Sequence, residues 1–589
     1  MILMQVKKNR VFTLLAIFCF FLLIRNILIL KFVEPSGYVV DIYSMFPFSF
    51  YLGLIFCYFV ASFLVLSGKK LIGLLILCTN HLEILLIPYM LGYYSMGRAD
   101  DMSYIGEYLQ IANSGHFAIW DVYPASHIIG AILSIVSSLE AHIVSFIIPI
   151  MFSFLFIMGI YLFSRELFPH ACIKSLVIPS SFIFYIGVYN FLNVPHALFF
   201  AFMPMYLFVM RSYFQNEKHV VLPFSVIFVL MTLLIPYTHP FIVFFLIVVF
   251  ILHLIPQIPY ISQLEILKIP PVNLASFLIL TVSFFSWLIY SDRLMGSLRI
   301  SYSGFINKMT EPVFFKTSDQ LTKIHFSFLD YVQLFSIFYG RYLIPTAFIV
   351  ASFIFFYYNK NILRNNIFKN YPYSVVLYAA FLFIQLILFL NPLISHQPDR
   401  ITNLNFMVYV QIPLFVISIY VFFLQKTKSF YRVCLVCMIL TSVWTLSLFG
   451  GLDSPRIYRT NAALTYNEVE GISWFYDLKD NDAIISIPLS QINRFHYLFG
   501  EDTKDSLKHF PDHFGYSNNS SKIKEINFEL GSYFYIVLLT IDELLYQEVP
   551  GYVEVGRYYK SDFIRLRDDT SINKIYDSLN IEIFISDVN

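Results

Sequence analysis

The chain has 589 residues, of which 58% are hydrophobic and only 13% are charged, and its mean hydropathy is +0.69. Soluble globular proteins carry about 25% charged residues, so this composition excludes that class. The formal net charge is +1 and no stripe of Lys and Arg occurs, which argues against a nucleic-acid partner. The charged residues gather in short clusters between long apolar runs, as is typical of a polytopic membrane protein.

Thirteen apolar runs qualify as candidate membrane spans. The first follows Lys7, Lys8 and Arg10 and lacks a small-residue cleavage site, so we interpret it as an uncleaved span rather than a signal peptide. Pro236 and Pro240 separate the seventh and eighth runs, and we expect a tight turn there rather than a kink in one long helix. The runs lie near residues 11–32, 48–66, 71–92, 141–163, 175–190, 195–210, 220–236, 239–256, 271–290, 332–357, 374–391, 403–424 and 433–450.

The distribution of Lys and Arg predicts the orientation of these spans. With a cytoplasmic N-terminus, sixteen basic residues fall in inner loops and seven in outer loops, and five of the seven belong to the single long loop 291–331. The positive-inside rule favours this arrangement. It places loops 93–126, 291–331 and 391–402 and the C-terminal segment on the external side of a cell membrane.

The composition changes abruptly after Gly451, where charged and small polar residues become frequent and no apolar run reaches spanning length. We therefore divide the chain into a transmembrane domain, 1–451, and an extracytoplasmic α/β domain, 452–589. The pattern of the second domain predicts a helix at Thr465–Leu478 and an irregular loop at Asp502–Lys524. It also predicts strands at Ala483–Pro488, Tyr535–Thr540 and Ile581–Ile585. The predicted fold class is an α-helical polytopic membrane protein with about 13 transmembrane helices and a small C-terminal α/β domain.

All six cysteines lie in the apolar runs and none lies in the C-terminal segment. This placement indicates neither a disulfide framework nor a cysteine metal cluster in that segment, so we expect them to fill space in the core.

The first large outer loop concentrates the residues that could carry chemistry. Asp100 and Asp101 stand side by side just beyond the third predicted span. An aromatic-rich segment follows, and Tyr123-Pro124 then opens a short apolar helix, Ala125–Leu139, that is too short to span and suits the membrane surface. Adjacent acids in a loop are also commonly solvated or cap a helix, and that interpretation stays open here.

This loop resembles the acidic first outer loop of the GT-C class of polytopic glycosyltransferases, especially archaeal-type and bacterial members related to protein mannosyltransferases. Three further segments are similar to that class: Thr238-His239-Pro240, the outer loop that contains His396 and Arg400, and Glu468–Trp474 with Asn573–Asp577 in the C-terminal segment. The resemblance covers the whole chain loosely. It implies a membrane glycosyltransferase that takes a sugar from a polyprenyl-phosphate donor at the external face.

The chain departs from the class in two respects. Its acidic motif follows the third span rather than the first, and its two acids are contiguous where a spaced pair is commoner. The sequence therefore leaves open which carboxylate acts. The C-terminal segment also lacks a Trp-Trp-Asp run, and Trp474–Asp477 replaces it poorly, which favours transfer of a single sugar over transfer of an oligosaccharide.

The chemistry of such a transfer assigns expected roles to these residues. A carboxylate, Asp100 or Asp101, would accept the proton of the acceptor hydroxyl. Arg400, with Arg341 or Arg293, would face the phosphate leaving group, because the guanidinium fork matches phosphate oxygens. The same two aspartates could instead hold a divalent cation, Mg or Mn. The remaining cavity candidates are His239, His396 and Glu107. The expected partners are the lipid bilayer, the polyprenyl-phosphate sugar donor and a glycan, lipid or protein acceptor that the sequence does not identify.

Three ionisable residues fall inside predicted spans, where a charge is costly. Arg25 and Glu83 lie at similar depths, so we expect a structural ion pair between them. Arg341 lies inside its span, well below the outer membrane surface, so its charge needs a partner, either a lipid phosphate or Glu83.

Two other functions compete with glycosyl transfer. A transporter or lipid flippase of a cell-envelope glycan pathway would share the composition, but we find no internal repeat between the two halves of the spans. A catalytically silent assembly protein would show an outer cavity without convergent carboxylates and arginines.

Overall fold

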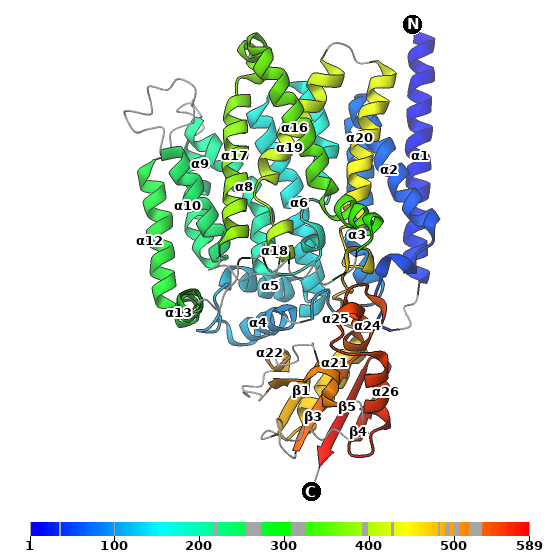
Figure 1. Ribbon diagram of the computed structural model, residues 1–589. Coiled ribbons are helices and arrows are strands. Elements are labelled where there is room, and N and C mark those ends of the chain that lie inside the picture. The colour runs from blue at the N-terminus through cyan, green and yellow to red at the C-terminus, as the bar shows by residue number, and fades with distance from the viewer. Residues whose placement is uncertain are drawn as a thin grey trace.

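The computed structural model describes residues 2–33, 37–98, 100–215, 221–254, 273–307, 312, 315, 318, 324, 326–391, 398–425, 429–480, 483–488, 495–499, 507–516 and 533–587. Helices form a tall bundle, and a small sheet lies against one end of it, opposite the N-terminus (Figure 1). The helices of the bundle are α1 (Ile2–Phe32), α2 (Phe48–Leu66), α3 (Lys70–Met90), α4 (Asp100–Ser114), α5 (Pro124–Ser137), α6 (Ala141–Leu167), α7 (Ala171–Ser181), α8 (Pro195–Gln215), α9 (Val221–Leu234), α10 (Pro240–Leu254), α12 (Leu274–Tyr290), α13 (Asp292–Ile306), α15 (Phe328–Leu334), α16 (Gly340–Tyr358), α17 (Tyr371–Leu390), α18 (Pro398–Asn403), α19 (Val408–Ile419) and α20 (Phe430–Phe449). The C-terminal elements are α21 (Tyr466–Leu478), β1 (Ile484–Ile487), α22 (His496–Phe499), β2 (Leu507–His509), β3 (Tyr533–Leu539), α24 (Thr540–Glu548), α25 (Tyr552–Val555), α26 (Lys560–Asp568), β4 (Asn573–Asp577) and β5 (Ile581–Asp587).

Within the described residues, eight helices are long and apolar enough to cross a membrane, or nine if the bent pair α12 and α13 counts as one span. The multi-pass helical class is thus confirmed. The predicted number of thirteen is higher because four of the runs form shorter apolar helices of 10–17 residues and a fifth forms α12. The shorter helices are Ala171–Ser181, Leu222–Tyr237, Pro240–Leu254 and Val408–Leu424.

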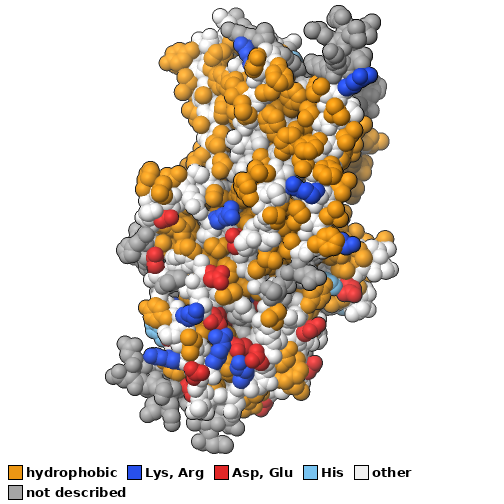
Figure 2. Space-filling view, turned by 90° about the vertical axis from the view of Figure 1, so that its right-hand side faces the viewer, with side chains coloured by type: hydrophobic (Ala, Val, Ile, Leu, Met, Phe, Trp, Pro, Cys, Tyr) orange, Lys and Arg blue, Asp and Glu red, His pale blue; other side chains and the backbone are white. Residues whose placement is uncertain are grey.

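The bundle exposes apolar side chains where a soluble protein would expose polar ones. On the face shown in Figure 2, hydrophobic side chains cover the upper part, and acidic side chains occur only from the middle of the molecule downward. Leu14, Ile17 and Phe21 of α1 are each more than half exposed. Contact with lipid tails accounts for this exposure, because an apolar side chain that faces hydrocarbon is not in contact with water.

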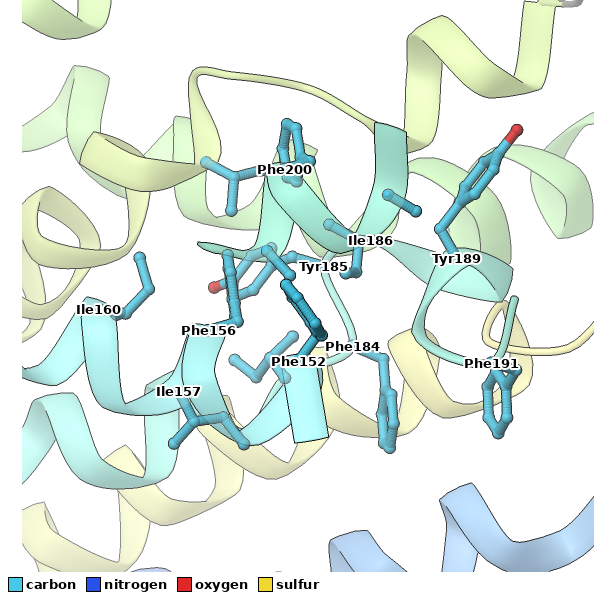
Figure 3. Packing of buried hydrophobic residues seen from close by; sticks show 14 of the residues in the cluster. Phe152, Phe156, Ile157, Ile160, Phe184, Tyr185, Ile186, Tyr189, Phe191 and Phe200 are labelled. Atoms are coloured by element: carbon cyan, nitrogen blue, oxygen red, sulfur yellow. The ribbon is translucent and has the colours of Figure 1, made fainter. Parts of the chain in front are cut away.

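The predicted span at 175–190 is wrong as a continuous helix. The helix α7 ends at Ser181, and residues 182–191 continue as a buried irregular segment packed beside the aromatic side chains of α6 (Figure 3). Irregular backbone at membrane depth requires partners for its polar groups. Other helices supply them: Phe184 N donates to Ser447 Oγ at 3.1 Å, and the Tyr342 hydroxyl donates to the carbonyl of Tyr185.

The expected ion pair between Arg25 and Glu83 is also absent from the described residues. The Arg25 guanidinium donates to Asn26 Oδ1 at 2.8 Å and to the Ser49 carbonyl at 2.6 Å. Neither carboxylate oxygen of Glu83 has a hydrogen-bond partner there. Equal depth in the membrane therefore did not imply contact. Asn26 and the Ser49 carbonyl accept from Arg25 Nη2 instead, whereas Arg25 Nε has no hydrogen-bond partner in the described part of the chain.

The turn predicted at Pro236 and Pro240 is confirmed. The helix α9 ends at Leu234, a 3-10 turn covers Ile235–Tyr237, and α10 begins at Pro240. The rings of Phe228 and Phe250 lie on opposite sides of this turn with centroids 6.5 Å apart, which is possible only if the two helices fold back on each other.

The C-terminal sheet has five strands in the order β2-β1-β3-β5-β4. β1 pairs in parallel with β2 and β3, whereas β5 is antiparallel to both β3 and β4. Alternate residues of β3 face opposite sides: Phe534, Ile536 and Leu538 pack toward α24 and α26, whereas Tyr535, Val537 and Leu539 join the main core with α21. Both faces of the sheet are therefore covered (Figure 1).

The three predicted strands and the predicted helix of this region are present, whereas two strands were not predicted. The segment expected to be an irregular loop contains β2, whose three residues pair with β1 through Ile485 and Leu507. The other unpredicted strand, β4, is interrupted by a register shift between Lys574 and Tyr576. Strands this short or irregular leave no readable alternation in a sequence.

Candidate functional site

The site lies where four short or bent helices meet at the end of the bundle that faces the sheet. The helices α4 and α5 run across the ends of the longer helices, and α13 turns by 90° from α12 (Figure 1). The apolar residues Ile300 and Ile306 of α13 are exposed, as expected for a helix that lies in a membrane interface. The short helix α18 completes the group.

These helices enclose a cavity of about 150 Å³. Five of the residues predicted from the sequence line it together: Asp100, Glu107, His239, Arg293 and Arg400. They come from four different elements, separated by as much as 300 positions in the chain. The other lining residues are Ser103, Tyr104, Asp121, Val122, Tyr123, His127 and His196.

Arg400, which is partly buried, supplies positive charge to the cavity. Burial alone would lower its pKa, but Tyr189, Asp100 and Tyr104 offset that effect, and the pKa of Arg400 is raised above its ordinary value. Two bonds hold the helix that carries it: Arg341 donates to the side chain of Asn403, and Gln385 Nε2 donates to the carbonyl of Ile401. The guanidinium is thus permanently charged and held in position.

Arg341, expected beside the phosphate, does not line this cavity. It is fully buried and donates to the carbonyls of Phe184 and Gly450, each at 3.2 Å, as well as to Asn403. It satisfies the irregular segment after α7, so its need for a partner inside the membrane is met by backbone oxygens. Glu83 is not among its partners.

The two adjacent aspartates face different surroundings, because neighbouring residues of a helix point about 100° apart. Asp100 lines the cavity, whereas Asp101 is buried behind it and accepts a hydrogen bond from Ser95 Oγ at 2.7 Å. Burial raises the pKa of Asp101 to about 7, although the Ser95 bond partly counteracts it. The pair therefore does not offer two carboxylates to the cavity.

An aromatic wall, made of Tyr123, His239 and His196, closes the side of the cavity next to α10. The ring of Tyr123 stacks on His239 with centroids 4.8 Å apart, and His196 meets His239 edge-on at 5.2 Å. His239 Nδ1 accepts from the amide of Phe241, so its Nε2 carries the proton when the ring is neutral. His196 was missed because it lies in an apolar run without any local motif. His396, the last predicted candidate, lies outside the described residues.

A second group of polar residues, Glu107, Asp121 and His127, lines the same cavity from α4, the following loop and α5. His127 Nδ1 lies 2.7 Å from Asp121 Oδ2, and Trp120 Nε1 donates to Glu107 Oε1 at 3.2 Å. Burial and the nearby negative charge of Asp121 raise the pKa of Glu107. The sequence placed all three residues in one loop, but only Glu107 was singled out.

A buried ion pair joins this loop to the C-terminal segment. Arg98 donates to Glu468 at 2.6 Å and 3.2 Å and to the Ala463 carbonyl at 2.7 Å. Glu468 is completely buried, and its carboxylate also caps α21 by accepting from Thr465. A two-residue bridge, Ser95 with Leu464, pairs the backbones beside it. The start of α4, and hence Asp100, is thereby fixed against α21.

These helices and the docked sheet define a multi-pass membrane protein with a polar cavity at one end. No family model matches the chain, and no curated protein matches it either. Comparison with solved structures finds the crystal structure of ArnT from Cupriavidus metallidurans bound to undecaprenyl phosphate, with a TM-score of 0.43 at 9% identity over 87% of this chain and 97% of that chain. The apo structure of the same protein gives 0.42 at 9% identity over 88% and 98%. Scores this low decide nothing about function, which is argued from the site.

The first prediction concerns Asp101. Because its folded pKa is about 7 and its ordinary value is 3.8, the folded protein holds a proton that the unfolded chain releases, so stability falls as pH rises through this window. We expect the melting temperature of the wild-type protein in detergent to fall more steeply between pH 5 and 8 than that of Asp101→Asn. Equal slopes for the two proteins would show that Asp101 is ionised throughout.

The second prediction concerns the Arg98–Glu468 pair. Replacing Arg98 by Ala leaves a buried carboxylate without its partner, which costs on the order of 3–5 kcal/mol. The control is Arg557→Ala, which breaks a more exposed pair with Asp512 and one bond to the Phe510 carbonyl and should cost about 1–2 kcal/mol. Denaturant unfolding, followed by intrinsic fluorescence, measures both. A loss for Arg98→Ala no larger than the control's would contradict a structural role for the pair.

Proposed function

We propose that the protein is a GT-C-like membrane glycosyltransferase that moves a sugar from a polyprenyl-phosphate-linked donor to an acceptor at the external face of the membrane. The observation that carries this proposal is the cavity in which the carboxylate of Asp100 and the guanidinium groups of Arg400 and Arg293 come together. Transfer from a lipid-linked sugar phosphate needs this combination: a base for the acceptor and positive charge for the leaving group.

Asp100 is the proposed base. Of the two adjacent acids it alone lines the cavity, and it is partly exposed, so an acceptor hydroxyl can reach it. It stands at the first residue of α4. In the reaction the acceptor oxygen attacks the anomeric carbon of the sugar, its proton passes to Asp100, and the bond to the phosphate oxygen breaks.

Arg400 and Arg293 are the proposed phosphate ligands. As the glycosidic bond breaks, the polyprenyl phosphate gains negative charge, and a guanidinium fork can donate two hydrogen bonds to its oxygens. Arg400 lies on α18, which bonds from Arg341 and Gln385 hold in place. Arg293 lies in the first turn of α13 and has an exposed side chain. We infer that Arg400 defines the phosphate position and that Arg293 closes over the head group after the lipid enters.

The surroundings of the cavity suit a substrate with a lipid tail. Tyr290 and Ile289, at the end of α12 next to Arg293, expose about two thirds of their side chains. Ile119 and Trp120, next to Asp121, are exposed as well. A polyprenyl chain can therefore lie against apolar side chains while its phosphate reaches the cavity, with no need to cross the bundle.

The third prediction tests the roles of Asp100 and Arg400. Purified protein in nanodiscs is given polyprenyl phosphates that carry different radiolabelled hexoses together with an envelope extract as the acceptor source, and release of polyprenyl phosphate is measured. We expect Asp100→Asn to lower the rate by about 10²–10⁴-fold, as for loss of a general base, and Arg400→Gln to lower it by about 10²–10³-fold, as for loss of an oxyanion donor.

Matched controls separate these roles from general damage. Asp101→Asn changes the neighbouring acid outside the cavity, and Arg299→Gln changes an exposed arginine on the same helix as Arg293, so both should retain the wild-type rate within a few-fold. Undiminished release in Asp100→Asn would remove the base assignment. The same protein in sealed proteoliposomes tests the competing function: movement of intact lipid-linked sugar across the membrane without release of polyprenyl phosphate would identify a flippase instead.

A further inference from the structure

The cluster of Glu107, Asp121 and His127 has the arrangement of a metal site. One potential ligand atom from each residue lies within 4.8 Å of the others, and all three side chains are buried. They come from three successive pieces of the chain: α4, the turn after it, and α5. The ligands of a dication lie about 2.0–2.2 Å from it and hence up to about 4.4 Å from one another, so the separations in this cluster are close to those of a metal site.

Two atoms of this cluster lack partners among the described residues. They are Glu107 Oε2 and His127 Nε2, and the residues that bear them are only 5% and 3% exposed. An unpaired buried polar atom costs on the order of 1–3 kcal/mol, so such atoms normally have a partner. Two such atoms in one cluster, next to the second carboxylate, Asp121, point to a ligand that binds both.

The hydrogen bonds around the cluster leave these two atoms available for a cation. Asp121 Oδ2 accepts from His127 Nδ1, which fixes the tautomer whose Nε2 carries a lone pair. Trp120 occupies Glu107 Oε1 and so leaves Oε2. A carboxylate behind a histidine ligand is the usual support of metal-bound imidazole. Asp121 Oδ1 is itself held by the amide of Tyr123 at 2.8 Å, so the support is rigid.

We propose that Glu107 Oε2 and His127 Nε2, with Asp121 as the third ligand or as the support of the histidine, bind a divalent transition-metal ion of the Zn²⁺ or Mn²⁺ type. The imidazole selects such ions over Mg²⁺ and Ca²⁺, which prefer oxygen alone. The dication also neutralises two buried carboxylates that are close to each other. The site differs from the pair Asp100 and Asp101, because Asp101 points away from the cavity.

The position of this site gives it a consequence for the proposed function. Its three residues line the same cavity as Arg400, so a bound dication would add positive charge beside the phosphate position. This consequence rests on the proposed glycosyl transfer, whereas the binding of the metal rests only on the cluster. The two can therefore fail separately.

The fourth prediction measures binding directly. The full-length protein in detergent is stripped with a chelator and titrated with Zn²⁺, Mn²⁺ or Mg²⁺, with calorimetry and intrinsic fluorescence as readouts. Trp120 donates to Glu107, so binding should change its emission, and Trp120→Phe should remove that change while calorimetry still shows binding. We expect one site per chain for Zn²⁺ or Mn²⁺ and at least tenfold weaker binding of Mg²⁺.

The variants Glu107→Gln and His127→Gln remove one proposed ligand atom each while keeping the shape, and each should weaken Zn²⁺ binding at least tenfold. The controls are Glu140→Gln and His116→Gln, which change exposed residues of the same region and should bind as the wild type does. Melting curves taken without metal show whether each variant is folded. Absence of Zn²⁺ and Mn²⁺ binding in the wild type, or wild-type affinity in both ligand variants, would overturn the site. Metal binding without any transfer activity would leave the site standing and count against the proposed function.

Discussion

The buried pair of Arg98 and Glu468 is the constraint on which the site depends. It connects the residue two positions before Asp100 to the first turn of α21, and the Glu468 side chain is completely buried. The pair is favourable there because both charges have further bonds: Arg98 to the Ala463 carbonyl, and Glu468 to the cap at Thr465. The pair thus joins α21, which packs on the sheet, to the start of α4. This is the helix that carries Asp100 and Glu107.

Arg341 and Arg400 contribute to the structure in two different ways. Arg341 donates hydrogen bonds to two backbone carbonyls and to Asn403, and it thereby stabilises an irregular segment and the short helix α18. Arg400, on that helix, turns its charge toward the cavity. The two arginines therefore form one assembly, because the bond from Arg341 to Asn403 holds the helix that places Arg400 at the cavity. The two aspartates differ in a similar way: Asp101 is buried and accepts a hydrogen bond from Ser95, whereas Asp100 faces the cavity.

The sequence predicted the parts of this molecule that follow from local pattern. The apolar runs located the helices, the prolines at 236 and 240 located a hairpin turn, and the adjacent acids with the arginine of the last outer loop indicated where the polar cavity lies. It did not distinguish Arg341 from Arg400, because the distinction depends on whether residues 182–191 form a helix or an irregular segment in need of donors. Nor did it predict the contact of Arg98 with Glu468, 370 positions apart. His127 escaped notice because its partner Asp121 becomes meaningful only when α5 folds back on α4. In each case the missing information is tertiary contact, which hydropathy and spacing do not contain.

The claim that a lipid-linked phosphate enters this cavity from the external side is tested most directly at Ser103, which lines the cavity on α4. In a background with the six native cysteines replaced, Ser103→Cys is reacted with a small membrane-impermeant thiol reagent in sealed vesicles of known orientation. Ser114→Cys, at the exposed end of the same helix, serves as the control. We expect both to react from the external side, and added polyprenyl phosphate to slow the reaction at residue 103 but not at residue 114. Reaction only from the cytoplasmic side, or equal rates with and without the lipid, would contradict the account.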